Sequence, residues 1–146
     1  MFLDEAGSNI AMTREYARAP VGERAHDKVP RNRGTVTTML GALTVEGITA
    51  MMTIEGATVF TVYVEQVLVP TLEPGDYVFL DNLGAHKTRR ALDAIRRAGA
   101  TPVFLPPYST DLNPIENAWS KLKTLLKEAK ARTCEALDEA IAWAMA

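Results

Sequence analysis

The feature that most limits the fold is a strand–helix–strand unit over residues 76–105. Its first strand lies within Asp76 to Asp81 and contains the apolar run Tyr-Val-Phe-Leu. Thr88 to Ala98 has the apolar spacing of an amphipathic helix, and Gly99 suits the position just after its end. The second strand is Thr101 to Leu105. A unit of this kind implies two parallel strands joined by a right-handed crossover.

Other segments extend this unit into a larger sheet. Met1 to Glu5 and Thr35 to Thr44 have the composition of strands. The second of these is followed by the turn signal Val45-Glu46-Gly47 and a partner strand, Ile48 to Ile54, so the pair predicts a hairpin. The remaining predicted elements are three helices. The first covers Thr58 to Val69, the second has Asn113 as N-cap and Pro114 as its first helical residue, and the third begins at Thr133. This order predicts an α/β fold, with a mixed sheet flanked by helices.

The composition limits the classes of protein to which the chain can belong. Its 146 residues suffice for one hydrophobic core, and 47% apolar with 23% charged residues is typical of folded globular domains. No apolar run is long enough to cross a bilayer, and no signal peptide opens the chain. Cys134 is the only cysteine, which excludes an internal disulfide. We therefore predict a single-domain cytoplasmic protein that is not associated with a membrane.

Three acidic residues occupy separate, recognisable contexts. Asp4 and Asp81 each end a short apolar run that is predicted to be a buried strand, and Glu116 follows the proline that opens a helix. Ligands of such sheets gather beyond the carboxyl ends of strands, so Asp4 and Asp81 are expected to lie close together. Carboxylate oxygens are the ligands that Mg²⁺ prefers. The chemistry suggested is metal-assisted attack on a phosphodiester.

Each of these residues also has a structural alternative. Asp4 could be a turn residue that follows a strand, and Asp81 beside Asn82 could form an Asx-turn. Glu116 stands three residues after Asn113, where a capping box uses a glutamate to reach the N-cap amide. Capping and metal binding compete for the same glutamate oxygens, so the sequence leaves both interpretations open.

Basic residues are concentrated in two parts of the chain. The net charge of −2 argues against a DNA-binding surface that covers the whole protein. Ile10 to Arg33 lacks a regular period and is predicted to form a long, irregular excursion. Its basic residues are Arg14, Arg18, Arg24, Lys28, Arg31 and Arg33, and a second group comprises Lys121, Lys123, Lys127, Lys130 and Arg132. The alternatives are a solvated surface and local contact with DNA phosphates, and we predict phosphate contact for the first group.

His86 and Lys87 lie just after Asp81, within the sequence Asp-Asn-Leu-Gly-Ala-His-Lys. His86 could be a metal ligand, a phosphate contact or a first-turn helix residue. A hard Mg²⁺ ion does not favour imidazole. We therefore predict that His86, together with Lys87, lies near DNA or another substrate.

Three blocks of sequence, taken in order, resemble the catalytic domain of DDE transposases. The first is Phe2 to Asn9 with Met12 to Arg14, the second is Leu80 to Lys87, and the third is Leu105 to Ser109 with Asp111 to Glu116. The chain looks most like the bacterial insertion-sequence branch of the mariner superfamily. The 34 residues between the second and third acids match the spacing of that superfamily.

The resemblance implies an RNase H-like fold, in which Asp4, Asp81 and Glu116 are catalytic ligands of two Mg²⁺ or Mn²⁺ ions. It also implies DNA partners (transposon ends and target) and a homodimer in the full-length assembly. Residues 1–146 would form the catalytic domain, truncated at both ends and without a helix-turn-helix region, so that this chain would not transpose DNA alone. Two alternatives are an RNase H-like nuclease without strand transfer and an inactive or regulatory DNA-binding remnant of a degenerate element.

Overall fold

The strand–helix–strand unit predicted over residues 76–105 is present in the computed structural model, which describes residues 1–55 and 60–145. Strand β4 (Tyr77–Leu80) and strand β5 (Thr101–Phe104) are parallel and are joined through helix α2 (Arg89–Arg97). Gly99, at φ 83°, follows the helix as predicted. The N–H groups of Gly99 and Ala100 bond to the carbonyls of Arg96 and Ile95, at 3.0 and 3.2 Å, which is a Schellman motif.

The sheet is mixed, as the order of predicted elements requires. Strands β1 (Phe2–Ser8), β2 (Thr37–Thr44) and β3 (Gly47–Glu55) form an antiparallel meander, and the five strands lie in the order β3-β2-β1-β4-β5. β1 is therefore central, antiparallel to β2 and parallel to β4. The predicted hairpin of β2 and β3 is confirmed. The predicted bounds of the first strand are wrong, because the ladder with β2 carries β1 past Glu5 as far as Ser8.

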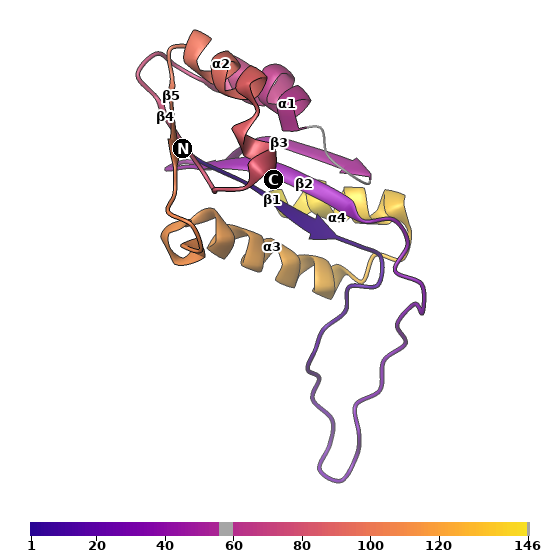
Figure 1. Ribbon diagram of the computed structural model, residues 1–146. Coiled ribbons are helices and arrows are strands. Elements are labelled where there is room, and N and C mark those ends of the chain that lie inside the picture. Colours follow the sequence, from indigo (N-terminus) through magenta and orange to yellow (C-terminus); the bar gives the residue numbers. More distant parts are fainter. Residues whose placement is uncertain (56–59, 146) are drawn as a thin grey trace.

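Helices cover both faces of this sheet (Figure 1). On one face, α2 and α1 (Phe60–Tyr63) pack over a core that includes Leu3 and Leu40. α1 continues as a π-helical turn at Val64–Leu68 and a 3₁₀ turn at Val69–Thr71. The helix predicted from Thr58 is confirmed in the described part, while its first two residues lie outside the described residues. None of the described helices is long and apolar enough to cross a membrane.

On the other face, α3 (Ile115–Ala129) and α4 (Cys134–Met145) pack over a second core (Figure 1). Trp119 of α3, only 1% exposed, lies directly on the sheet at Gly41. A Cβ atom at Gly41 would stand 3.0 Å from the Trp119 ring and 3.0 Å from Ile48, so only glycine allows this approach. Gly41 is the cross-strand partner of Asp4. Because Gly41 has no side chain, α3 can approach the part of β1 that carries Asp4.

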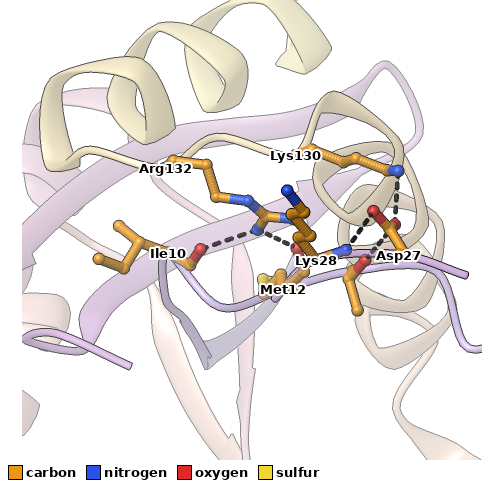
Figure 2. A network of polar contacts seen from close by, with 7 residues as sticks. Ile10, Met12, Asp27, Lys28, Lys130 and Arg132 are labelled. Carbon is orange, nitrogen blue, oxygen red and sulfur yellow. Dashed lines mark hydrogen bonds and ion pairs between the residues drawn. The ribbon is translucent and has the colours of Figure 1, made fainter. Parts of the chain in front are cut away.

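The excursion predicted over Ile10 to Arg33 is part of the connection between β1 and β2, residues 9–36, which extends away from the sheet as an irregular hairpin (Figure 1). Its base is attached to the connection between α3 and α4, as Figure 2 shows. Arg132 Nη1 donates to the carbonyls of Ile10 and Met12, each at 2.9 Å, and Lys130 pairs with Asp27. Lys127 also pairs with Glu15. The sequence left two alternatives for the second basic group, a solvated surface or contact with DNA phosphates. In the structure, residues of this group hold the excursion in place.

Candidate active site

Asp4 reaches the site from the middle of β1, and not from the end of a strand as predicted. β1 pairs with β4 only at Phe2↔Phe79 and Leu3↔Leu80, so Asp4 is level with Asp81, the first residue after β4. The prediction failed because it considered each strand alone, whereas the longer partner β2 continues β1 beyond the point where β4 stops. Asp4 and Asp81 nevertheless lie close together, as expected, because β1 and β4 pair in parallel in this register.

Glu116 enters from the first turn of α3, on the same sheet face as Asp4. Side chains alternate along a strand, so Asp4 shares a face with Ala6, which belongs to the core beneath α3. Glu116 and Trp119 are three residues apart and lie on one side of the helix. Because Trp119 packs over Gly41, opposite Asp4, the first turn of α3 is held above this part of β1.

The prediction that Asn113 caps α3 is wrong. α3 begins at Ile115, its N-cap is Pro114, and no side chain caps it. The N–H groups of Glu116 and Asn117 bond instead to the backbone carbonyls of Asn113 and Pro114, at 3.1 and 3.2 Å. Asn113 is buried, with 5% exposure, and does not fold back over the helix end. Without a capping asparagine there is no capping box to compete with a ligand role for Glu116.

Asp4, Asp81 and Glu116 line one pocket of about 540 Å³. Lys87, Asn113 and the segment from Leu105 to Ser109 also line it. The three acids, which are separated by long stretches of sequence, are thus brought to a single cavity at the end of β4. Their roles as catalytic metal ligands remain a prediction.

Negative charge predominates in the pocket, because three carboxylates and one lysine, Lys87, line it. Asp4 is 7% exposed, and burial is the main reason why its pKa rises from 3.8 to about 6. The carboxylates of Glu116 and Asp81 raise this pKa further, whereas the Glu5 backbone N–H and His86 lower it. A buried carboxyl beside two others holds its proton more strongly unless a cation compensates.

Asp81 is held in a fixed orientation by its own loop. Its Oδ1 accepts a hydrogen bond from the Leu83 N–H, at 3.1 Å, and lies against Nδ1 of His86. The predicted Asx-turn alternative is therefore present. It does not exclude a ligand role, since both contacts use Oδ1, and a carboxylate has a second oxygen. The side chain of Asp81 remains 32% exposed at the pocket.

His86 lies in the 3₁₀ turn Gly84–Lys87, where it is 1% exposed. Its ring packs against Phe60 of α1, with ring centroids 4.3 Å apart, and anchors the Asp81 carboxylate to the core. The DNA contact predicted for His86 stays a prediction, and the burial of this ring argues against it. The neighbouring Lys87 is exposed, lines the pocket, and lies over the Phe104 ring at 5.7 Å from its centroid.

The other residues predicted to contact DNA lie on the excursion, and none of the six lines the described pocket. Arg14 pairs with Glu128 of α3, at 3.2 Å. The remaining five are exposed, and within the part of the chain that the structure describes their side chains form no ion pair. These are Arg18, Arg24, Lys28, Arg31 and Arg33. Their charge is therefore available to an anionic partner.

Sequence reasoning missed Tyr108 and Asn113 as residues of the site. Tyr108 is fully exposed at the pocket, with a left-handed φ of 59°, between Pro107 and Ser109. Two consecutive prolines before it were a signal of an unusual loop. Asn113 offered no such signal, because asparagine before Pro114 has the sequence pattern of an ordinary helix cap.

The donor set of the pocket suits a hard divalent cation, since three carboxylates offer oxygen ligands. Among the described residues, no group of three His, Cys, Asp or Glu side chains forms a ready-made metal cage. Mutual repulsion between ionised carboxylates opposes a closer approach without a countercharge. The pocket is therefore an open site of suitable chemistry rather than a closed structural one.

The fold is similar to that of several solved structures. The Mos1 strand transfer complex has a TM-score of 0.77 with 19% identity over 99% of this chain and 46% of that chain. The Mos1 mariner paired end complex with Mn has a TM-score of 0.59 with 17% identity, over 97% and 51% of the respective chains. The catalytic core domain of BIV integrase has a TM-score of 0.52 with 16% identity, over 78% and 74%. The fold is thus the RNase H-like fold.

The sequence itself defines the family. The profile of the DDE superfamily endonucleases matches residues 1–138, nearly the whole chain. The chain therefore belongs to the DDE superfamily of endonucleases. It spans about half the length of the Mos1 chains that it resembles. No curated protein matches its sequence significantly.

Proposed function

We propose that this chain is the catalytic domain of a transposase, which cleaves DNA strands and joins a DNA 3′ end to a target. One observation carries the proposal: Asp4, Asp81 and Glu116, the three acids to which the resemblance assigns the catalytic role, line a single pocket. Support comes from the likeness to Mos1 in a strand transfer complex.

In this proposal, Asp4, Asp81 and Glu116 hold two Mg²⁺ or Mn²⁺ ions. Bound divalent ions would activate a water or DNA hydroxyl as nucleophile and stabilise the leaving oxygen. Asp4 supplies a buried carboxylate on a rigid central strand, and His86 fixes Asp81 through Oδ1. Glu116 is exposed at the first turn of α3 and has more freedom to adjust. The similar Mos1 complex with Mn supports this choice of cations.

DNA is the proposed partner, as transposon ends and as target. Lys87 lies at the pocket, next to the place where a phosphate would approach the carboxylates. The excursion supplies Arg14, Arg18, Arg24, Lys28, Arg31 and Arg33 for more distant phosphates. Arginines without a regular element to seat them in a groove suit backbone contacts better than base contacts. A homodimer is proposed for the full-length assembly only.

A plasmid assay tests the proposed activity. We expect the chain to nick supercoiled DNA, without sequence preference, when Mg²⁺ or Mn²⁺ is present and not when it is chelated. In the same reaction, a labelled duplex with a free 3′-hydroxyl should become joined to the plasmid whatever its end sequence, which is strand transfer without the end recognition that transposition requires. Nicking without joining would indicate the alternative nuclease, and binding without either reaction would indicate a non-catalytic remnant.

The salt dependence of DNA binding tests the role of the excursion. Replacing Arg24, Arg31 and Arg33 together by alanine should reduce the slope of log K against log salt by about 2.7, since each phosphate contact contributes about 0.9. A matched control replaces Arg89, Arg96 and Arg97 of α2, which removes equal charge from another surface. Fluorescence anisotropy with a short duplex gives both slopes. Equal changes in the two triple variants would mean that only net charge matters.

A further inference from the structure

Asn113 lines the pocket with an amide oxygen that lacks the hydrogen bond expected of a buried polar atom. Its side chain is 5% exposed, and it lies with the three carboxylates among the lining residues. Its Oδ1 is closed to solvent, and within the described part of the chain this oxygen has no hydrogen-bond partner. Buried polar atoms are nearly always paired, so each exception requires an explanation.

A structural role does not explain this asparagine. The first N–H groups of α3 bond to backbone carbonyls, and the Asn113 side chain caps nothing. An unpaired buried oxygen costs free energy, and an apolar residue of similar shape would avoid that cost. The polar group therefore lowers the stability of the free protein at a position where a leucine would serve packing better.

The chemistry of the pocket indicates what could pair with the amide. Water molecules bound to a divalent cation point their hydrogens away from the ion and need acceptors around them. Carboxylate oxygens that coordinate the cation are occupied by that coordination. The Asn113 oxygen, by contrast, is neutral and has no partner among the described residues. The terminal torsion of asparagine is broad, so the amide can turn its oxygen toward the cleft at little cost.

We infer that Asn113 is a positioning residue, which accepts a hydrogen bond from a water molecule of the cation held by Asp4, Asp81 and Glu116. This inference rests on the proposed function, because it requires a divalent ion in the pocket. Hydrated Mg²⁺ usually keeps several of its waters in protein sites, so such a partner is available. Groups of this kind orient the ligands of a metal and tune its affinity.

The experiment compares Asn113→Leu, Asn113→Asp and the unchanged chain. Each protein is titrated with Mn²⁺ alone, and the electron paramagnetic resonance signal of the free ion measures how much Mn²⁺ is bound. Asn113→Leu should bind Mn²⁺ about 10- to 100-fold more weakly, the usual effect of removing an outer partner. Its melting temperature without metal should rise by a few degrees, because the unpaired oxygen is gone. Asn113→Asp keeps an acceptor oxygen and should bind Mn²⁺ at least as well as the unchanged chain.

The combination of weaker metal binding and higher metal-free stability is the distinguishing result. A lower melting temperature for Asn113→Leu would show that the amide supports the fold, and would overturn the inference. Unchanged Mn²⁺ affinity in this variant would also overturn it. Asn117→Leu, at an exposed position in the first turn of α3, controls for the added apolar side chain. If the unchanged chain binds no Mn²⁺, the proposed metal site itself fails, which is a different outcome.

Discussion

Asp81→Asn is expected to lower metal-dependent DNA nicking by about 10²–10³-fold, while the protein stays folded. The substitution removes the negative charge that would hold a divalent cation, and loss of one preorganised charge-stabilising group at an active site costs about 10²–10³-fold. The fold should survive, because an asparagine Oδ1 can still accept from the Leu83 N–H and His86 Nδ1. Plasmid nicking rates and thermal melting together measure both effects.

Asp138→Asn is the matched control for this substitution. Asp138 is exposed on α4 and is not among the residues that line the pocket. The same change of charge there should leave nicking within about twofold of the unchanged chain, because exposed charges are screened by salt. Nicking that persisted in Asp81→Asn at the unchanged rate would remove Asp81 from the proposed catalytic set.

The local order of elements could be predicted well from the sequence. The strand–helix–strand unit at residues 76–105 is encoded by apolar periodicity and by Gly99 as a C′ residue, both of which act within a few residues. The hairpin of β2 and β3 depends on an equally local turn. The gathering of Asp4, Asp81 and Glu116 at one pocket followed from strand order and the family resemblance.

What could not be predicted depends on contacts between distant parts of the chain. The length of β1 is set by its ladder with β2, whose residues lie about thirty positions away. The excursion is held by Arg132 and Lys130, more than a hundred residues from Ile10 and Asp27. A basic residue near the end of a helix gives no sign of which segment it will bind.

The same limit explains why the sequence did not show the environments of two polar residues, Asn113 and His86. Asn113 has the local pattern of a cap, but its place at the pocket decides its environment. The sequence placed His86 only by its distance from Asp81, whereas its ring is buried against Phe60, a contact made through the tertiary fold. Local propensity yields to tertiary packing at both positions, and both adjoin the candidate site.

Asp4→Asn is expected to raise the free energy of unfolding of the metal-free protein at pH 7.5 by about 1–3 kcal/mol, while it abolishes nicking. Burial, then the carboxylates of Glu116 and Asp81, raise the pKa of Asp4 from 3.8 to about 6. At pH 7.5 the folded protein therefore contains a buried negative charge that the unfolded chain leaves in water. Asparagine removes that charge and keeps the shape of the side chain.

The pH dependence of this stability difference tests whether the charge of Asp4 is its cause. Because the pKa of Asp4 is higher in the folded state, protonation favours folding, and the stability associated with Asp4 is fully present below about pH 4. It is lost as the pH rises through about 6. The difference in unfolding free energy between Asp4→Asn and the unchanged chain should therefore be small at pH 4 and reach its full value above pH 7. Urea titrations across this range measure it.

Added Mn²⁺ should reduce or remove the difference in stability between Asp4→Asn and the unchanged chain. A cation that binds only the folded state stabilises it by mass action. It would do so in the unchanged chain, where its charge compensates Asp4, and much less in Asp4→Asn. With 10 mM Mn²⁺ at pH 7.5, the advantage of the variant should shrink or disappear, whereas Asp138→Asn should follow the unchanged chain throughout. A stability difference that is independent of both pH and Mn²⁺ would contradict the view that the fold tolerates a buried charge at Asp4 in order to bind a cation.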